Sequence, residues 1–367
     1  MQMLAQSSMH SLLLSLSSMH TSNTPCSRWY GAPLPVLAPP PYKSCAGPWI
    51  PTLMGDSLIC PHSSNGTLKR EYRLRGMGES LLGACLAVAA SFSWSVGAVF
   101  YWVGVGSVRS PLVANWVRTP AALLVMLAIA VSTKGLESVL GAFLNHRGLS
   151  YVVLATVLAI VGGDTLYIAA LRDAGVSVTY PIAYSYVVVA SVLSVLLLEE
   201  SASVGLVAGV VLVLLGAYTM GRASEGQGSG ENPRRGVLEA VGACMLWGGG
   251  VVAFKLASME IAPVAVGAVK ALVVLLLLSP FAGRLRGASL KAVVALWLGG
   301  AVSLGLGDWL YYQSLLALGA SRTSVVVTTS LAFSLVLARL LLEEEITPRK
   351  AVAATLIWAG ALLAIYY

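Results

Sequence analysis

The chain has 367 residues, of which 57% are hydrophobic in type and only 11% are Asp, Glu, Lys or Arg. A soluble domain carries roughly twice that share of charged residues, so the composition excludes an ordinary soluble enzyme and a disordered protein. The net charge of +7 does not indicate nucleic-acid binding, because the basic residues are scattered along the chain. We therefore expect a helical membrane protein with several spans.

The first 76 residues differ in composition from the rest. They hold nine of the 16 prolines, three of the five cysteines and three of the four histidines. The spacing of these cysteines and histidines matches no metal-ligand pattern, so we predict neither a metal site nor a cofactor. We expect residues 1–76 to be a disordered or mis-annotated N-terminal tail, because Met77 precedes the first long apolar run and would be a natural start.

From Leu81 onward the sequence is typical of membrane spans, each of which needs about 20 mainly apolar residues. Residues 221–235 form the longest polar break, are flexible in composition and divide the spans five and five. The ten predicted spans are 81–104, 111–131, 149–171, 174–198, 203–220, 236–257, 261–281, 291–316, 321–342 and 350–367.

An internal repeat is the strongest signal in the sequence. Residues 163–167 (GDTLY) recur at 307–311 (GDWLY), and at the same shift Gly175 falls on Gly319. We predict an all-α membrane protein with ten transmembrane helices, built as two five-helix repeats at 77–220 and 236–367. Because five is odd, the second repeat is inverted in the membrane. Inverted repeats are typical of secondary transporters, whose site lies near the midplane between the repeats.

Earlier in each half the shift is about 152 residues, and it pairs Trp94 with Trp247 and Arg118 with Lys270. Leu246-Trp247-Gly248, followed by Phe254-Lys255, resembles the first-helix signature of the EamA-type transporters, which belong to the drug/metabolite transporter superfamily. Arg118 and Lys270 are similar to the basic residue of that family's second helix.

The ends of the fourth and ninth predicted helices, 198–200 and 342–344, resemble the end of the family's fourth helix, with Glu in place of Gly. The resemblance extends over about residues 80–367 and implies a multi-pass protein of the cell membrane with cytoplasmic termini. The implied partners are a small-molecule substrate and the lipid bilayer, with no nucleic acid; a homodimer is left open.

Four ionisable residues lie well inside predicted spans, where a charge is costly unless it faces a cavity or a partner. Arg118 is seven residues into its helix, and Asp164 is seven residues from the end of the next one, so both lie roughly 10 Å from the same face. The same reasoning places Lys270 level with Asp308, and we predict two ion pairs, Arg118–Asp164 and Lys270–Asp308. Each pair is either a static link between helices or part of the substrate pathway.

Glycines precede both aspartates, and the alternative interpretation is that either carboxylate caps a backbone amide at a local helix break. Aromatic residues are the other candidates for a substrate pathway, because Tyr and Trp join an apolar body to one polar tip. We predict that five of them line a cavity: Trp94, Tyr167, Tyr184, Trp247 and Tyr311. The glutamates that end the fourth and ninth helices are expected to be solvated.

These features favour a secondary transporter of a small metabolite, amino-acid-like or another small organic solute, that works by alternating access. No Walker A motif is present, so direct use of ATP is not expected, and we predict no enzymatic activity. The alternative is an intramembrane aspartyl protease, because Gly305-Leu306-Gly307-Asp308 fits a Gly-x-Gly-Asp signature and Asp164 would be its second carboxylate.

Overall fold

The computed structural model describes residues 66–105, 108, 110–133, 136–223, 232–285, 288–341 and 345–366. Within these residues the chain is helical and contains no strand, and ten helical segments are long and apolar enough to cross a membrane. This confirms the ten predicted spans. The first repeat comprises α2 (Gly66–Val105), α3 (Pro111–Thr133), α4 (Glu137–Leu144), α5 (His146–Thr156), η1 (Val157–Asp164), α6 (Thr165–Ala174), α7 (Val176–Ala183), α8 (Tyr186–Leu198) and α9 (Val204–Ala223).

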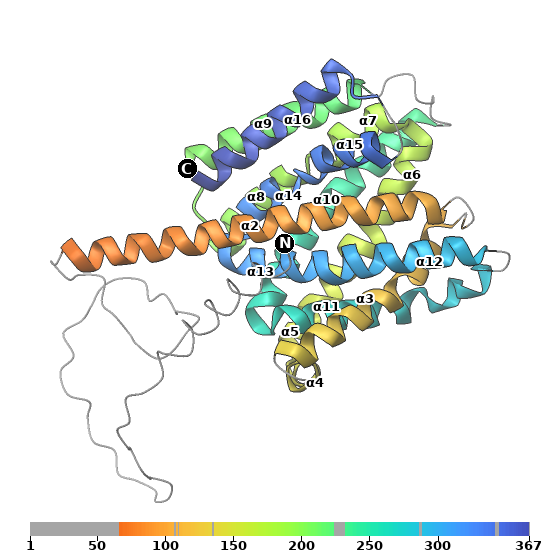
Figure 1. The fold of residues 1–367 in the computed structure, drawn as a ribbon, viewed down its shortest axis with the longest axis horizontal. Helices are drawn as coiled ribbons and strands as arrows, with labels where there is room; N and C mark the ends of the chain where they lie inside the picture. The colour runs from red at the N-terminus through yellow and green to blue at the C-terminus, as the bar shows by residue number, and fades with distance from the viewer. Residues whose placement is uncertain are drawn as a thin grey trace, which may run out of the picture. The chain divides into compact units, whose positions relative to one another are not determined.

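The second repeat has the same order of spans. It comprises α10 (Pro233–Glu260), α11 (Pro263–Leu278), η2 (Ser279–Leu285), α12 (Leu290–Gly299), η3 (Gly300–Gly307), α13 (Asp308–Leu318), α14 (Ala320–Val327), α15 (Ser330–Leu341) and α16 (Pro348–Tyr366). The end of α16 and the beginning of α2 lie at the same end of the helix bundle (Figure 1). Three residues at each end of the predicted linker 221–235 are helical, because α9 ends at Ala223 and α10 begins at Pro233.

The helix that contains the first span, α2, begins before the span itself, which is Ser80–Tyr101. Residues 66–76, expected to be part of a disordered tail, are the first turns of α2, whereas residues 1–65 lie outside the described part of the chain. This stretch contains Leu, Lys, Arg and Glu and no proline. These residues have good helix propensity, and extending an existing helix avoids the cost of a new nucleus.

The two repeats share their departures from regular helix. The third and eighth spans each contain a π-helical segment, η1 and η3, just before or at the aspartate. The fourth and ninth spans are interrupted at residues 184–185 and 328–329. Gly175 and Gly319 join the third to the fourth span and the eighth to the ninth with positive φ angles of 76° and 92°, which glycine adopts without strain. These irregularities recur at equivalent positions, as expected for a duplicated five-helix unit.

The spans pack mainly against spans of the other repeat. Helix α2 packs on α12, η3 and α13, while α10 packs on α5, η1 and α6 in the equivalent way. Helix α3 packs on α11 and η3, α8 on α14, and α9 on α16. The α9–α16 contact is close enough that a Cβ added to Gly209 would lie 2.6 Å from the Gly360 carbonyl oxygen. The two repeats therefore form one interleaved bundle.

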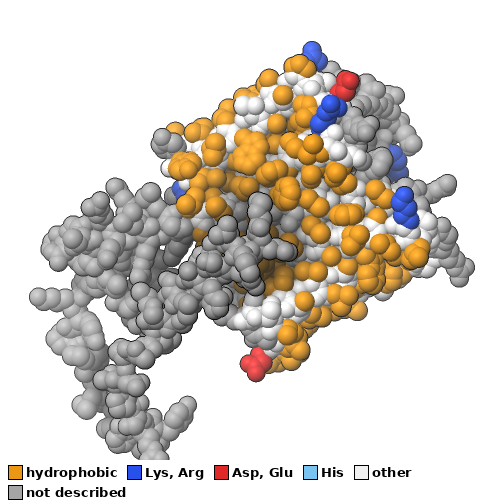
Figure 2. Space-filling model, viewed as in Figure 1, with side chains coloured by type: hydrophobic (Ala, Val, Ile, Leu, Met, Phe, Trp, Pro, Cys, Tyr) orange, Lys and Arg blue, Asp and Glu red, His pale blue; other side chains and the backbone are white. Residues whose placement is uncertain are grey.

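Figure 2 shows apolar side chains spread over the whole described face of the bundle, with the coloured charges near its edges. Many large apolar residues are exposed there or elsewhere on the bundle, among them Leu196 and Leu276, at 70% and 72% exposure. In a soluble protein such a surface would aggregate, whereas in a bilayer it is the surface that faces the lipid tails. The structure is thus that of a multi-pass membrane protein.

Candidate functional site

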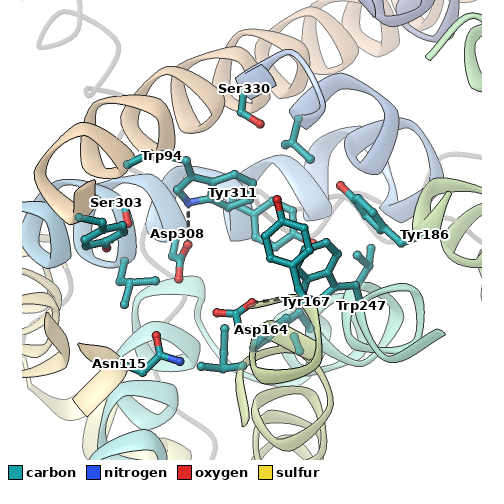
Figure 3. A pocket seen from close by; sticks show the side chains of 18 of the residues that line it. Trp94, Asn115, Asp164, Tyr167, Tyr186, Trp247, Ser303, Asp308, Tyr311 and Ser330 are labelled. Carbon is teal, nitrogen blue, oxygen red and sulfur yellow. Dashed lines mark hydrogen bonds between the residues drawn. The ribbon is translucent and has the colours of Figure 1, made fainter. Parts of the chain in front are cut away.

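A cavity of about 420 Å³ lies between the two repeats. All five aromatic residues predicted to line a cavity contribute to its wall, and so do three of the four predicted charged residues; Lys270 does not. Figure 3 shows the side chains of Asp164 and Asp308 within this space, with Trp94, Tyr167, Trp247 and Tyr311 around them. The residues whose roles were predicted from the sequence are therefore gathered in one place.

The π-helical segments determine where the aspartates sit. Residue Asp164 ends η1, and Asp308 begins α13 directly after η3. The two glycines before Asp164 allow a close approach, because a Cβ added to Gly163 would lie 2.5 Å from the indole of Trp247. Gly307 has the same relation to Trp94, at 2.8 Å. Single π-helical turns are frequent at functional sites, and here each one brings a carboxylate against a tryptophan.

Both ion pairs expected from the depth argument are present. Arg118 Nη2 lies 3.3 Å from Asp164 Oδ2, and Lys270 Nζ contacts Asp308 Oδ2. Their exposure differs: the side chains of Arg118 and Asp164 are 13% and 24% exposed, against 3% and 7% for Lys270 and Asp308. Both residues of the first pair therefore line the cavity, whereas in the second pair only Asp308 does and Lys270 is buried behind it. A role for either pair in substrate passage stays a prediction.

Each aspartate also accepts a hydrogen bond from the opposite repeat. Trp94 Nε1 donates to Asp308 Oδ1 over 2.8 Å, and Trp247 Nε1 donates to Asp164 Oδ1 over 3.1 Å. The tryptophan rings also contact the tyrosines three residues beyond each aspartate, with centroids 5.2 Å apart for Trp94–Tyr311 and 4.8 Å apart for Trp247–Tyr167. Each carboxylate thus links a basic side chain of its own repeat to a tryptophan of the other repeat.

The expectation that an aspartate caps a freed amide is wrong. Asp164 occupies the N-cap position of α6 but makes no side-chain cap hydrogen bond, because both of its oxygens are engaged by Trp247 and Arg118. Asp308 lies within the first turn of α13, whose N-cap residue is Gly307.

The expectation of solvated glutamates at the end of the fourth span is also wrong for one residue. Glu200 accepts hydrogen bonds from the amides of Ala320 and Ser321, at 2.6 and 2.9 Å, and from the Ser321 hydroxyl. Its carboxylate therefore caps the first turn of α14, where a negative charge is favoured. Glu199 is exposed, as expected. The equivalent residues Glu343 and Glu344 lie outside the described residues.

Tyr101, Ser303 and Asn115 are among the polar residues of the cavity wall that were not singled out from the sequence. Tyr101 donates from its hydroxyl to the Gly299 carbonyl oxygen over 3.0 Å, its ring lies 4.6 Å from the Arg118 guanidinium carbon, and its hydroxyl is 2.6 Å from Ser303 Oγ. Asn115, the third, is 4% exposed. It precedes Arg118 by three residues and so shares its helix face. This spacing could have identified Asn115 from the sequence. Ser303 lies in η3, whose π-helical geometry has no sequence signature.

Within the described residues, no group of three or more His, Cys, Asp or Glu side chains is placed to hold a metal ion. The cavity instead presents charged residues from two ion pairs, several hydroxyl and amide groups, and a wall of aromatic rings. These groups suit reversible binding of a small organic molecule, because a few fixed polar groups orient a ligand within a mainly apolar pocket.

Comparison with known proteins is consistent with this arrangement. A search of curated proteins returned no match. A solved crystal structure aligns with 77% of this chain and 98% of its own, with 20% sequence identity and a TM-score of 0.60, which shows a shared fold. The sequence profile of the EamA-like transporter family matches twice, over residues 81–222 and 234–366. The chain therefore belongs to the EamA-like transporter family, in the drug/metabolite transporter superfamily.

Proposed function

We propose that the protein is a secondary transporter that moves a small organic solute, amino-acid-like in size, across the cell membrane by alternating access. The observation that carries this proposal is the cavity of about 420 Å³ lined by both repeats. Its volume lies in the range of small-molecule sites, roughly 300–1,000 Å³. Its wall is mostly apolar and aromatic, with a few polar groups that would orient a solute.

The unequal exposure of the two ion pairs supports alternating access. The side chains of Arg118 and Asp164 are more exposed than those of Lys270 and Asp308, and Lys270 does not reach the cavity wall. In an inverted repeat, exchanging the conformations of the two halves opens the opposite face. The other state would then seal the Arg118–Asp164 pair and expose Lys270–Asp308, so each pair would serve one face of the membrane.

The charges also bear on the solute and on the source of energy. The two bases and the two aspartates balance, so the site favours a solute that is neutral overall or zwitterionic. Of the described residues that line the cavity, the only carboxylates are Asp164 and Asp308, and each has a basic partner. A pathway without an unpaired carboxylate favours uniport or exchange over proton coupling.

The intramembrane protease alternative receives no support from the site. Two catalytic aspartates must share one proton between adjacent carboxylates. In the described part of the chain, Asp164 and Asp308 make no hydrogen bond to each other, and each is held by its own base and its own tryptophan. This arrangement is suited to holding two separate charges rather than to peptide-bond hydrolysis.

The test is transport by the purified full-length protein in liposomes. A thermal-shift screen of small zwitterionic and neutral solutes identifies binders, because a ligand of the folded state raises its apparent stability. Counterflow of a labelled binder is then compared between the wild type and Asp164→Asn. We expect counterflow by the wild type and a large loss in the variant. Binding without counterflow in the wild type would contradict the proposal.

A further inference from the structure

The cavity has a polar end that the repeat symmetry does not generate. Tyr101 and Phe254 occupy equivalent positions in the two repeats, because each lies seven residues after the tryptophan of its repeat, Trp94 or Trp247. Ser303 and Ala159 are equivalent through the shift of 144 residues. The close contacts agree, because a Cβ on Gly97 would meet Ser303 as a Cβ on Gly250 would meet Ala159. The polar Tyr101–Ser303 contact of one side is thus replaced by apolar groups on the other.

Asn115 is a second difference of the same kind. It precedes Arg118 by three residues, and the residue in the same place before Lys270 is Gly267. Gly267 packs against α3, where an added Cβ would lie 2.3 Å from Met126, so it leaves no room for an amide. The residues that depart from the symmetry therefore give the cavity wall hydroxyl and amide groups near Arg118, whereas their symmetry-related counterparts supply none.

The polar end contains hydrogen-bond donors that no protein atom satisfies. In the part of the chain that the structure describes, Asn115 Nδ2 and Arg118 Nε are buried without a hydrogen-bond partner. Both residues line the cavity, and Figure 3 shows the Asn115 amide directed into it on the side of Asp164. Buried donors normally have partners, so two unpaired donors at a cavity wall indicate a ligand that supplies acceptors.

We propose that Asn115 and Arg118, supported by Tyr101 and Ser303, form a head-group site that selects solutes carrying a carboxylate or carboxamide oxygen. This inference rests on the proposed function, because it takes the cavity to be the substrate site. The guanidinium and the amide can only donate through these nitrogens, so the head group must accept. The aromatic wall at Tyr184, Tyr186 and Trp247 would contact the body of the solute.

The charge balance limits the head group to one of low charge. Arg118 is already paired with Asp164, 3.3 Å away, and Asp308 also lines the cavity. A dianionic phosphate would add two negative charges to a site whose two carboxylates already balance Arg118 and Lys270. A neutral amide oxygen avoids that repulsion, and a carboxylate, with a single negative charge, incurs less of it; either group uses both donors.

A trapped water is the rival occupant of these donors. A void of about 10 Å³ beside the cavity is lined by Asn115, Arg118, Thr119 and Lys270, among others, which is near the lower limit for one water. If a water there satisfies the donors, changes at Asn115 will alter stability without altering ligand preference. Thr119 lines this void but not the cavity, so it provides a matched control on the same helix.

The experiment measures the Kd of three probes with the same benzyl body on the purified full-length chain: phenylacetate, phenylacetamide and 2-phenylethylammonium. We expect the first two to bind more tightly than the third. Asn115→Ala should weaken both by about tenfold, the effect of losing one hydrogen bond, and leave the ammonium probe unchanged. Asn115→Ser, which keeps a donor, should be intermediate, and Thr119→Ala should resemble the wild type. A preference for phenylacetate over phenylacetamide would assign the head group as a carboxylate, and the reverse as an amide.

Three results would overturn the head-group site: no binding of either oxygen-bearing probe, equal binding of the ammonium probe, or equal losses in Asn115→Ala and Thr119→Ala. Should Asn115→Ala fail to fold, Asn115→Ser decides, because unchanged affinity and preference in that variant also contradict the site. Counterflow separates the two proposals. Transport without the oxygen preference removes the head-group site alone, whereas oxygen-selective binding without transport of any bound solute removes the proposed function alone.

Discussion

Trp247 in the second repeat donates a hydrogen bond to Asp164 in the first, with Nε1 and Oδ1 3.1 Å apart. The symmetric bond joins Trp94 to Asp308 in the opposite direction. The tryptophans were expected only to line a pathway. In the structure they also tie each aspartate to the other repeat, so a movement of one half relative to the other must preserve or exchange these bonds.

Changing Trp247→Phe removes this hydrogen bond and keeps an aromatic ring near Tyr167. A hydrogen bond to a charged group contributes about 1.5–3 kcal/mol, so we expect a lower melting temperature in detergent and slower counterflow. Trp297→Phe is the matched control, because Trp297 is 42% exposed on α12 and lies outside the cavity wall. Equal effects of the two substitutions would mean that loss of indole volume, and not of the bond, is responsible.

The Lys270–Asp308 pair gives a second prediction. Asp308→Asn leaves Lys270, which is 2% exposed, buried without its counter-ion. Breaking a buried pair costs on the order of 3–5 kcal/mol, so the variant should be strongly destabilised. Adding Lys270→Met removes the unpaired charge and should recover much of the stability. Thermal stability of both single variants and of the double variant measures the coupling, and additive losses would contradict the pair.

The same cycle on Arg118 and Asp164 should show weaker coupling. Equivalence of the repeats would predict equal coupling, but this pair is more exposed and its N–O distance is 3.3 Å. Solvent reduces the interaction of exposed charges. We expect the coupling energy of Arg118 and Asp164 to be clearly smaller than that of Lys270 and Asp308. Equal values would mean that the difference in exposure has no energetic consequence.

The sequence predicted the spans, the duplication and the positions of the paired charges, because each depends on a local or periodic signal. Apolar runs mark spans by length, and a shift of 144 residues aligns the two GD motifs without a gap. The depth of Arg118 and Asp164 follows from counting residues along two antiparallel helices. None of these three predictions requires knowing which spans are in contact in the folded protein.

What the sequence did not predict depends on contacts between distant spans. The Trp247–Asp164 bond and the Glu200 cap both cross from one repeat to the other, and no spacing rule relates residues so far apart. The π-helical segment that places Ser303 beside Tyr101 has no compositional signature beyond its glycines. Asn115 is the exception, because its spacing from Arg118 already placed both on one helix face.

Interleaving of the repeats predicts how the chain behaves when it is cut. Helices α2, α3 and α9 of the first repeat pack mainly on helices of the second. A cut within residues 224–231, between α9 and α10, should give two fragments that form a stable complex when co-expressed. Either fragment alone should be degraded or aggregate, because its apolar interface is uncovered. A stable, monodisperse fragment on its own would contradict the interleaved arrangement.

Glu200 provides the last prediction, because its neighbour Glu199 is a matched control. The Glu200 carboxylate accepts from the Ala320 and Ser321 amides and so joins the end of α8 to the beginning of α14. Glu200→Gln removes the negative charge that the N-terminus of α14 favours and weakens the cap. N-caps contribute about 0.5–2 kcal/mol and the charge a further 0.3–1 kcal/mol, roughly, so we expect a loss of about 1–2 kcal/mol in the free energy of unfolding. Glu199→Gln removes the same charge from an exposed side chain and should change stability by less than about 0.5 kcal/mol. Chemical unfolding in mixed micelles measures both variants. If Glu199→Gln is as destabilising as Glu200→Gln, the effect belongs to the general charge of this helix end and not to the cap across the repeats.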